Sequence, residues 1–429
     1  QMIGDLTHAN TIYQHILDSI AQNDGTVTRA IEQQYNAFHD QYAHLGYPAD
    51  LADTLTPAYN HTYTDILAVR DAQATSLQIE NHDLAHCPPE IGLLTNLETL
   101  SIYTLQAMTL PCTLANLTNL QALYFTTKGL DVPPESIAKL PNLQTLSFRY
   151  AGFTTLPTWI GKLSQLRELI LEKNALTTLP DSISQLTQLE TLNIEENQLS
   201  DLPTDIGQLT NLRELKLRDN ALTTIPSDIG SLRQLTFLEL NFNQLTALPD
   251  SLGNLQNLTH LLIRGNQLAE LPAWIANLTK LETIAFADNS ISHFPAWMNQ
   301  LSNLQRIYAS GNQISKLPDL TALTQLKSID LTNNQLTALP AWISEMPSLQ
   351  SIKVSDNQLT YLPDTLCQLE NCYEISAMNN QLLDLPRCIG ALPKLRFTYF
   401  KGNPLTALPN DVDRTDDRAI RAWLQSDDR

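Results

Sequence analysis

A period of 23 residues runs through most of this 429-residue chain and constrains its fold more than any other feature. The segments LRELILEKNALTTLPDSI from Leu166, LETLNIEENQLSDLPTDI from Leu189 and LRELKLRDNALTTIPSDI from Leu212 align without gaps at that offset. An asparagine marks each unit, at Asn174, Asn197, Asn220, Asn243, Asn266, Asn289 and Asn312, and after one step of 22 at Asn334, Asn357, Asn380 and Asn403. A repeat of this length predicts an array of stacked units rather than several compact domains.

The residue types within one unit indicate how its chain folds. Leu169 and Leu171 alternate with polar residues, which predicts a short strand with one buried face. The side chain of Asn174 has both donors and acceptors, so at the turn after the strand it can bond backbone groups of its own and the adjacent coil. Pro180 and its equivalents fix the turn that leads to the convex side. One coil cannot bury its leucines alone, but stacked coils share one core behind a wall of parallel strands.

This pattern resembles the leucine-rich repeat superfamily over residues 72–410. The form with Leu-Pro and a following Ile is similar to the intracellular type, which includes plant Ras-group-related repeat proteins and bacterial repeat proteins, some of them effectors. The resemblance implies an α/β fold, namely a right-handed horseshoe-shaped solenoid with a parallel sheet on its concave side. The register extends to about fifteen coils. We expect the first four to be less regular, since their asparagine position holds Ala151, Lys128, Leu105 and His82.

The two ends of the chain do not follow the repeat. Residues 1–71 contain three or four segments with apolar residues at helical spacing, and we expect them to form a helical region that covers the first coil. Residues 411–429 contain Ile420, Trp423 and Leu424 on one helical face, which predicts a short capping helix at the other end.

Charge and hydropathy narrow the class of partner. The formal net charge is −19, so the surface repels phosphate backbones and anionic lipids. We therefore expect neither nucleic acid nor a membrane as the partner, and we expect a protein partner, with the charge favouring a basic one. No run of 18 apolar residues and no apolar export segment is visible, so we expect a cytoplasmic location, or secretion into a host cell as an effector.

The five cysteines carry no recognisable framework. Their spacing fits neither a zinc site nor a disulfide cap at the ends of the chain, and we expect a reducing compartment. Cys87 and Cys372 fall on leucine positions of the repeat, which predicts that both are buried and inert.

No constellation of catalytic residues stands out. The chain lacks a phosphate-binding loop and the common hydrolase and metalloprotease motifs, so we expect no enzymatic activity and no cofactor. Histidines gather in the first 86 residues, and His82 and His86 lie four apart. They are either metal ligands or solvated side chains. The second interpretation is favoured because no acidic or cysteine residue lies at ligand spacing, and we expect no metal.

The side chains of the strands that face away from the core form the candidate site. Aromatic residues and arginines, which dominate protein interfaces, gather there on neighbouring coils. The predicted partner-binding surface consists of Ile170, Glu172, Glu195, Arg218, Phe237, Glu239, Phe242, His260, Leu262, Arg264 and Tyr308. A secondary patch on earlier coils consists of Tyr103, Tyr124, Arg149 and Tyr150.

Two interpretations of these surface residues remain open. They either bind a partner or only support each other as cross-strand pairs. The first makes the chain a monomeric, non-catalytic recognition module, a scaffold or a bacterial effector, that holds a protein on its concave face. The alternative function is the substrate-targeting portion of a larger enzyme of the ubiquitin ligase, kinase or GTPase type. Its catalytic domain would lie outside this chain.

Overall fold

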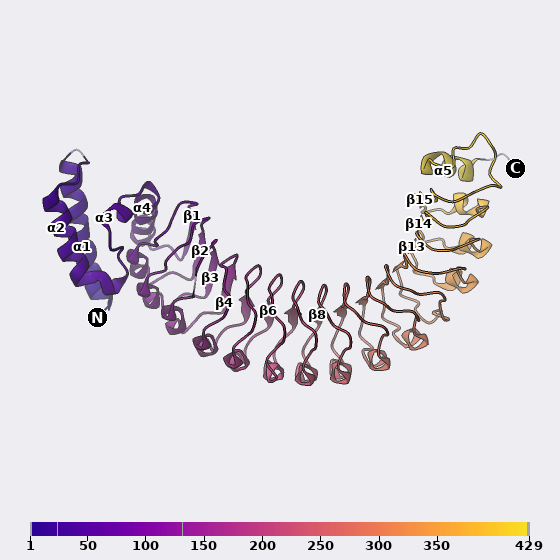
Figure 1. Ribbon diagram of the computed structural model, residues 1–429, viewed down its shortest axis with the longest axis horizontal. Coiled ribbons are helices and arrows are strands. Elements are labelled where there is room, and N and C mark those ends of the chain that lie inside the picture. Colours follow the sequence, from indigo (N-terminus) through magenta and orange to yellow (C-terminus); the bar gives the residue numbers. More distant parts are fainter. Residues whose placement is uncertain (1, 24, 131, 427–429) are drawn as a thin grey trace. The chain divides into compact units, whose positions relative to one another are not determined.

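A computed structural model describes residues 2–23, 25–130 and 132–426 (Figure 1). The chain divides into two compact units, Gln1–Leu212 and Arg213–Arg429, and each is described by itself. Within each unit the strands lie along one side and short 3₁₀ turns along the other (Figure 1).

The first unit begins with helices and continues with stacked coils. Its helices are α1 (Met2–Gln22), α2 (Arg29–Tyr42), α3 (Leu51–Thr54) and α4 (Pro57–Asp71). Its parallel strands pair in chain order and are β1 (Ser76–Glu80), β2 (Thr99–Tyr103), β3 (Ala122–Thr126), β4 (Thr145–Arg149), β5 (Glu168–Ile170) and β6 (Thr191–Asn193). Helices α1 and α4 pack against the 3₁₀ turn of the first coil, η2 (Pro89–Leu93), as expected for a cap.

In its described residues, 213–426, the second unit contains nine further parallel strands, again paired in chain order. They are β7 (Glu214–Lys216), β8 (Phe237–Glu239), β9 (His260–Leu262), β10 (Thr283–Ala285), β11 (Arg306–Tyr308), β12 (Ser328–Asp330), β13 (Ser351–Lys353), β14 (Glu374–Ser376) and β15 (Phe397–Tyr399). Partners in adjacent strands lie 23 residues apart, or 22 between β11 and β12. The predicted solenoid with a parallel sheet is therefore confirmed in both units.

Helix α5 (Asp417–Gln425) ends the second unit and lies against its last coil. Asp416 caps the helix by accepting a hydrogen bond from the main-chain N–H of Arg418. Ile420 and Leu424 are buried, and the guanidinium of Arg387 lies 4.5 Å from the ring centre of Trp423. These contacts agree with the predicted capping role.

The asparagine ladder satisfies backbone groups inside the coils. The amide nitrogen of Asn243 donates to the carbonyl oxygens of Leu217 at 3.0 Å and Leu240 at 3.1 Å. Its amide oxygen accepts from the N–H of Leu222 at 3.0 Å. Because these groups are buried, leaving them unpaired would cost free energy. The same bonds recur at Asn266, Asn289, Asn312, Asn334, Asn357, Asn380 and Asn403.

The first coils use a different ladder. Asn81, Thr104 and Thr127 lie one residue before the predicted asparagine position and 23 residues apart. Thr104 donates to the carbonyl of Leu84 at 3.1 Å, and the side-chain amide of Asn81 donates to a carbonyl of α4 at 2.9 Å. Strands β1–β4 are five residues long, whereas all later strands have three. These coils therefore differ in the position of the ladder and have longer strands.

The cysteines correct the prediction that their spacing carries no recognisable framework. Cys367 and Cys388 form a disulfide between the 3₁₀ turns of two adjacent coils, with their Cα atoms 5.5 Å apart. Short spacings between cysteines do not reveal this bond, because stacking brings together residues about one repeat apart. Cys87 and Cys372 are buried free thiols, as predicted. Burial raises the pKa of both thiols, and that of Cys372 reaches about 11, so both are neutral at pH 7.

Candidate functional site

The register of strand β8 confirms which side chains leave the core. Leu238 and Leu240 are fully buried, whereas Phe237 and Glu239 are half-buried on the opposite face of the strand. We call the side of the sheet that carries such residues the strand face. Phe242 follows the strand and is also half-buried, so the two phenylalanines stand at opposite ends of β8.

Phe242 lies between two arginines from neighbouring coils. The guanidinium carbons of Arg218 and Arg264 lie 5.3 and 5.2 Å from its ring centre, within the range of cation–π attraction. Each arginine also pairs with a carboxylate, Asp219 at 2.9 Å and Asp288 at 2.7 Å. We call Arg218, Phe242, Arg264 and Gly265 the Phe242 cluster.

The backbone of Phe242 adopts the left-handed conformation, with φ of 53°. This conformation costs an L-residue roughly 1–2 kcal/mol and is an outlier for a bulky side chain. The same position in other coils of this unit holds residues that tolerate it better, namely Asp219, Gly265, Asp288, Gly311, Asn333, Asp356, Asn379 and Gly402. The coil therefore keeps an aromatic side chain where the backbone favours glycine, asparagine or aspartate.

Gly265 makes room for the ring. A Cβ atom at this residue would lie 2.5 Å from the Cδ1 of Phe242, closer than packed atoms allow. Gly265 is itself left-handed, with φ of 65°. A larger residue would clash with the ring of Phe242 and would be strained at this backbone angle. The position of the ring therefore depends on a glycine at residue 265.

Phe237 belongs to a second cluster at the start of the strand. Its ring lies 5.6 Å from that of His260, its partner in the register of β9. The ammonium group of Lys216 lies 5.5 Å from the ring centre of Phe237. We call Lys216, Phe237 and His260 the Phe237 cluster.

Between these two clusters the strand face has a row in the middle of the strands. Glu239 accepts a hydrogen bond at 2.9 Å from Asn241, and Leu262 lies beside it in the register. Tyr308, two strands further on, is exposed, and the small Ala285 separates it from Leu262. In this row the larger side chains of Leu262 and Tyr308 therefore stand on either side of the small Ala285.

The remaining members of the predicted surface lie in the first unit. Ile170 pairs in register with Ser147 and Asn193 and is half-buried. Glu172 lies 3.4 Å from the guanidinium of Arg149 and 3.7 Å from the ammonium group of Lys173. Glu195 is half-buried, and its carbonyl accepts the N–H of Lys173.

The residues of the secondary patch also lie in the first unit, where they make separate contacts. Tyr150 accepts a hydrogen bond at 2.8 Å from Lys173, whose ammonium group lies 5.0 Å from the tyrosine ring centre. Tyr103 packs edge-on against His82 at 5.4 Å between ring centres, and Tyr124 is exposed. Lys173 connects this patch to Glu172, a link that the sequence did not reveal.

The structure thus groups the predicted residues into local clusters. It adds Lys216, Gly265 and Asp288, which the sequence argument did not select. Gly265 carried a signal, since a glycine one residue before a ladder asparagine indicates a left-handed position. The partner of Phe237 follows from the 23-residue register, but its contact with Lys216 depends on side-chain direction.

The histidines of the first coils contact neighbouring side chains. His82 packs on a tyrosine, and His86 lies 3.8 Å from Asp53 and 2.9 Å from the hydroxyl of Thr109. Within residues 2–23, 25–130 and 132–426, no group of three or more His, Cys, Asp or Glu side chains is placed to hold a metal ion. In the same ranges, no helix has the length and apolar character that a bilayer requires.

Comparisons with known proteins match the repeat. The model of a leucine-rich repeat region matches residues 126–222 and 224–313, and a model of two leucine-rich repeats matches residues 302–344. A comparison with curated proteins found no match.

Solved structures match over most of the chain. A leucine-rich repeat protein of Leptospira interrogans is 34% identical, over 77% of this chain and 85% of that protein, with a TM-score of 0.73. The plant peptide hormone receptor RGFR1 in complex with RGF2 is 26% identical over 79% of this chain and 61% of the receptor, with a TM-score of 0.63. An internalin of Listeria monocytogenes is 22% identical over 82% of this chain and 99% of the internalin, with a TM-score of 0.62. At this identity the match shows the fold alone.

Proposed function

The chain belongs to the leucine-rich repeat superfamily, and from this premise we propose that it is a non-catalytic recognition module that holds a protein partner on its strand face. The repeats of this fold form a protein-interaction module, so the fold favours a binding role over a catalytic one. Within that role, the Phe242 cluster is the best candidate for the centre of the contact.

One observation carries this proposal, namely the left-handed Phe242 between Arg218 and Arg264. A strained residue that the surrounding structure keeps is a reason to suspect function. Phenylalanine here does not serve the backbone, since glycine or asparagine would suit it better. Aromatic and arginine side chains are also the types whose removal weakens interfaces most.

The Phe242 cluster is suited to rigid recognition. Asp219 and Asp288 hold the two arginines at salt-bridge distance, and the arginines flank the ring. Side chains that are fixed before binding lose less conformational entropy when the partner arrives. The cluster then offers an apolar ring together with guanidinium groups that already have counter-ions.

The partner's charge and the location are finer proposals. The net charge of −19 favours a basic partner through long-range attraction, although the Phe242 cluster itself is of mixed charge. The disulfide between Cys367 and Cys388 favours an oxidising compartment. We therefore propose that the chain, as a monomer, acts outside the cytoplasm, either as a scaffold or as a secreted effector.

The proposal is tested by measuring binding of a captured partner to matched variants. Phe242→Asn removes the ring but keeps a residue that tolerates the left-handed backbone, so stability should not fall. Loss of a hot-spot side chain costs about 2 kcal/mol or more, which is about 30-fold in Kd. The control is Gln244→Ala with Glu270→Ala, two exposed residues outside both clusters. Equal affinity of Phe242→Asn and this control would reject the Phe242 cluster as the centre of the contact.

The two clusters are tested together with a triple variant. Phe237→Ala, Phe242→Ala and Arg264→Ala together remove the two phenylalanine rings and one guanidinium. If the partner is held as tightly by this variant as by the unchanged chain, neither cluster is the binding surface.

A further inference from the structure

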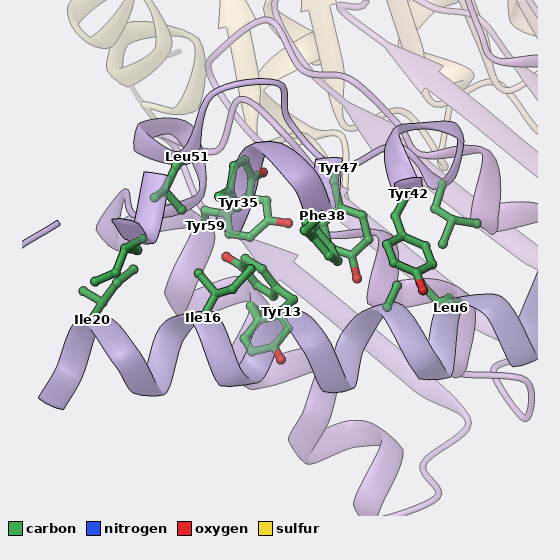
Figure 2. Close-up of a cluster of buried hydrophobic side chains, with 14 residues drawn as sticks. Leu6, Tyr13, Ile16, Ile20, Tyr35, Phe38, Tyr42, Tyr47, Leu51 and Tyr59 are labelled. Carbon is green, nitrogen blue, oxygen red and sulfur yellow. The ribbon is translucent and has the colours of Figure 1, made fainter. Parts of the chain in front are cut away.

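Glu90 is a fully buried carboxyl group where the N-terminal helices cover the first coil. It lies in η2, against which α1 and α4 pack. The N-terminal region buries a group of aromatic side chains. Figure 2 shows Tyr13, Tyr35, Tyr47 and Tyr59 in one buried cluster with Phe38. A buried carboxyl group needs compensating partners, because burial disfavours its charged form.

Among the residues that the structure describes, the carboxyl group has one side-chain partner. The hydroxyl of Tyr47 donates to its Oε1 at 2.5 Å, whereas its Oε2 is buried without a hydrogen-bond partner. The hydroxyl oxygens of Tyr13 and Tyr59 are also buried without a partner. One charge-bearing oxygen and two hydroxyls are therefore left unpaired among the residues that α1, α4 and η2 contribute.

The titratable groups around Glu90 are neutral near pH 7. They come from α1, α2, the segment before α3, α4 and the first coil, and they are Tyr13, Tyr35, Tyr47, Tyr59, Tyr63 and Cys87. Burial raises the pKa of each above its ordinary value, so all of them stay neutral, and neither tyrosine nor cysteine carries a positive charge in any form. An ionised Glu90 would thus be buried with one hydroxyl donor and a backbone hydrogen bond, and with no cation among these groups.

We propose that Glu90 acts as a proton-operated latch between the N-terminal helices and the repeats, holding them together when it is protonated and loosening them when it ionises. The uncharged acid can be buried at modest cost, whereas the carboxylate regains water only if the helices move away. The latch concerns the cap of the first unit and is independent of partner binding on the strand face.

The direction of the pH dependence follows from the shift. Burial, the largest cause, raises the pKa of Glu90 from 4.5 to about 7, against a smaller lowering by the hydrogen bond from Tyr47. The docked state therefore keeps its proton in a range where the undocked state has lost it, and docking weakens as the pH rises from 4.5 to about 7. Across both pKa values the equilibrium constant for docking should fall about 300-fold in total, and about 30-fold of this fall should occur between pH 5.5 and 8.

A second ionisable pair crosses the same boundary and must be separated from the first. His86, next to the first 3₁₀ turn, lies 3.8 Å from Asp53 of α3, and both side chains are partly exposed. A histidine gains charge as the pH falls, which would also strengthen docking in acid. Because exposed ion pairs are screened by water and contribute little, we expect this pair to add only a small part of the effect.

Hydrogen exchange of the full chain, measured by mass spectrometry between about pH 5.5 and 8, tests the latch. After correction for the intrinsic rate, protection of the α1 and α4 amides should fall about 30-fold, while that of β3 and β4 stays constant. Equal protection of α1 and α4 at both pH values in the unchanged chain overturns the proposal.

Three variants identify the group responsible. Glu90→Gln keeps an oxygen that can accept from Tyr47 but cannot ionise, so its protection should change less than about 3-fold over the range. His86→Asn should keep most of the pH dependence. If the dependence persists in Glu90→Gln and disappears in His86→Asn, the latch is assigned to the wrong group. Should Glu90→Gln fail to fold, Tyr47→Phe decides. It removes the hydroxyl that favours the carboxylate, so the loss of protection must continue to higher pH, and a loss that ends at the same pH as in the unchanged chain contradicts the proposal.

Discussion

Replacing Asn266 with alanine tests how the repeats hold their backbone. The amide nitrogen of this residue donates to the carbonyls of Leu240 at 3.0 Å and Ile263 at 3.1 Å. Its amide oxygen accepts the N–H of Leu245 at 3.0 Å. Asn266→Ala removes these three bonds from the interior of two adjacent coils, together with a longer one to the carbonyl of Arg264 at 3.3 Å, which keeps its bond from the N–H of Phe242.

The free-energy cost of Asn266→Ala follows from the hydrogen bonds that each backbone group keeps in the variant. The carbonyls of Leu240 and Ile263 each keep a bond from another ladder residue, Asn243 and Asn289. Losing one of two donors should cost each of them little, about 0.5 kcal/mol. The N–H of Leu245 keeps no acceptor in its buried position, and an orphaned buried donor costs about 1–3 kcal/mol. We therefore expect Asn266→Ala to destabilise its coils by about 2–4 kcal/mol.

Local hydrogen exchange is the appropriate assay, because the stability of a repeat array is a sum over neighbouring coils. Amides of β8 and β9 should lose protection, and those of β14 should change little. Gln267→Ala is the matched control, since Gln267 is exposed next to Asn266 and its replacement should cost less than about 0.5 kcal/mol. If Asn266→Ala also cost less than about 0.5 kcal/mol, the ladder would not stabilise the coils in the way described here.

Three further predictions follow from individual contacts. Gly265→Ala should cost about 1–3 kcal/mol, because its Cβ would lie 2.5 Å from a ring carbon of Phe242, and part of this loss should be recovered by Phe242→Ala in a double-mutant cycle of urea unfolding. Thr104→Val should destabilise the second coil by about 1–2 kcal/mol, seen as loss of β2 protection, whereas no loss would mean that threonine does not replace the ladder asparagine. Reduction of the disulfide between Cys367 and Cys388, 21 residues apart, should cost about 3 kcal/mol in urea unfolding with and without dithiothreitol, and an unchanged midpoint would refute this.

The repeat pattern predicted most of the fold because its physical causes are local and periodic. Leu238 and Leu240 had to be buried and Phe237 had to face the other way, since side chains of a strand alternate. The same register placed Asn243, rather than Asn241, in the ladder, and the hydrogen bonds agree. For such positions the 23-residue spacing determines the neighbours.

What the sequence could not give depends on side-chain direction and on the cap. Phe237 and Phe242 are five positions apart, but the pattern alone did not show that they belong to different clusters. Glu90 occupies a position that holds serine, threonine, aspartate, tryptophan or cysteine in other coils, and its contact with Tyr47 depends on a segment outside the repeats. The disulfide was missed because its cysteines meet through stacking rather than through short spacing.

The most direct test of the central claim is a hydrogen-exchange footprint of the complex between the full chain and its captured partner. We predict slower exchange at the strand face of the second unit, in peptides that contain Phe242 and Arg264. Peptides from the 3₁₀ turns of the same coils should be unaffected. Protection confined to those 3₁₀ turns, with the strand-face peptides unchanged, would contradict the proposal that this chain binds its partner through its strands.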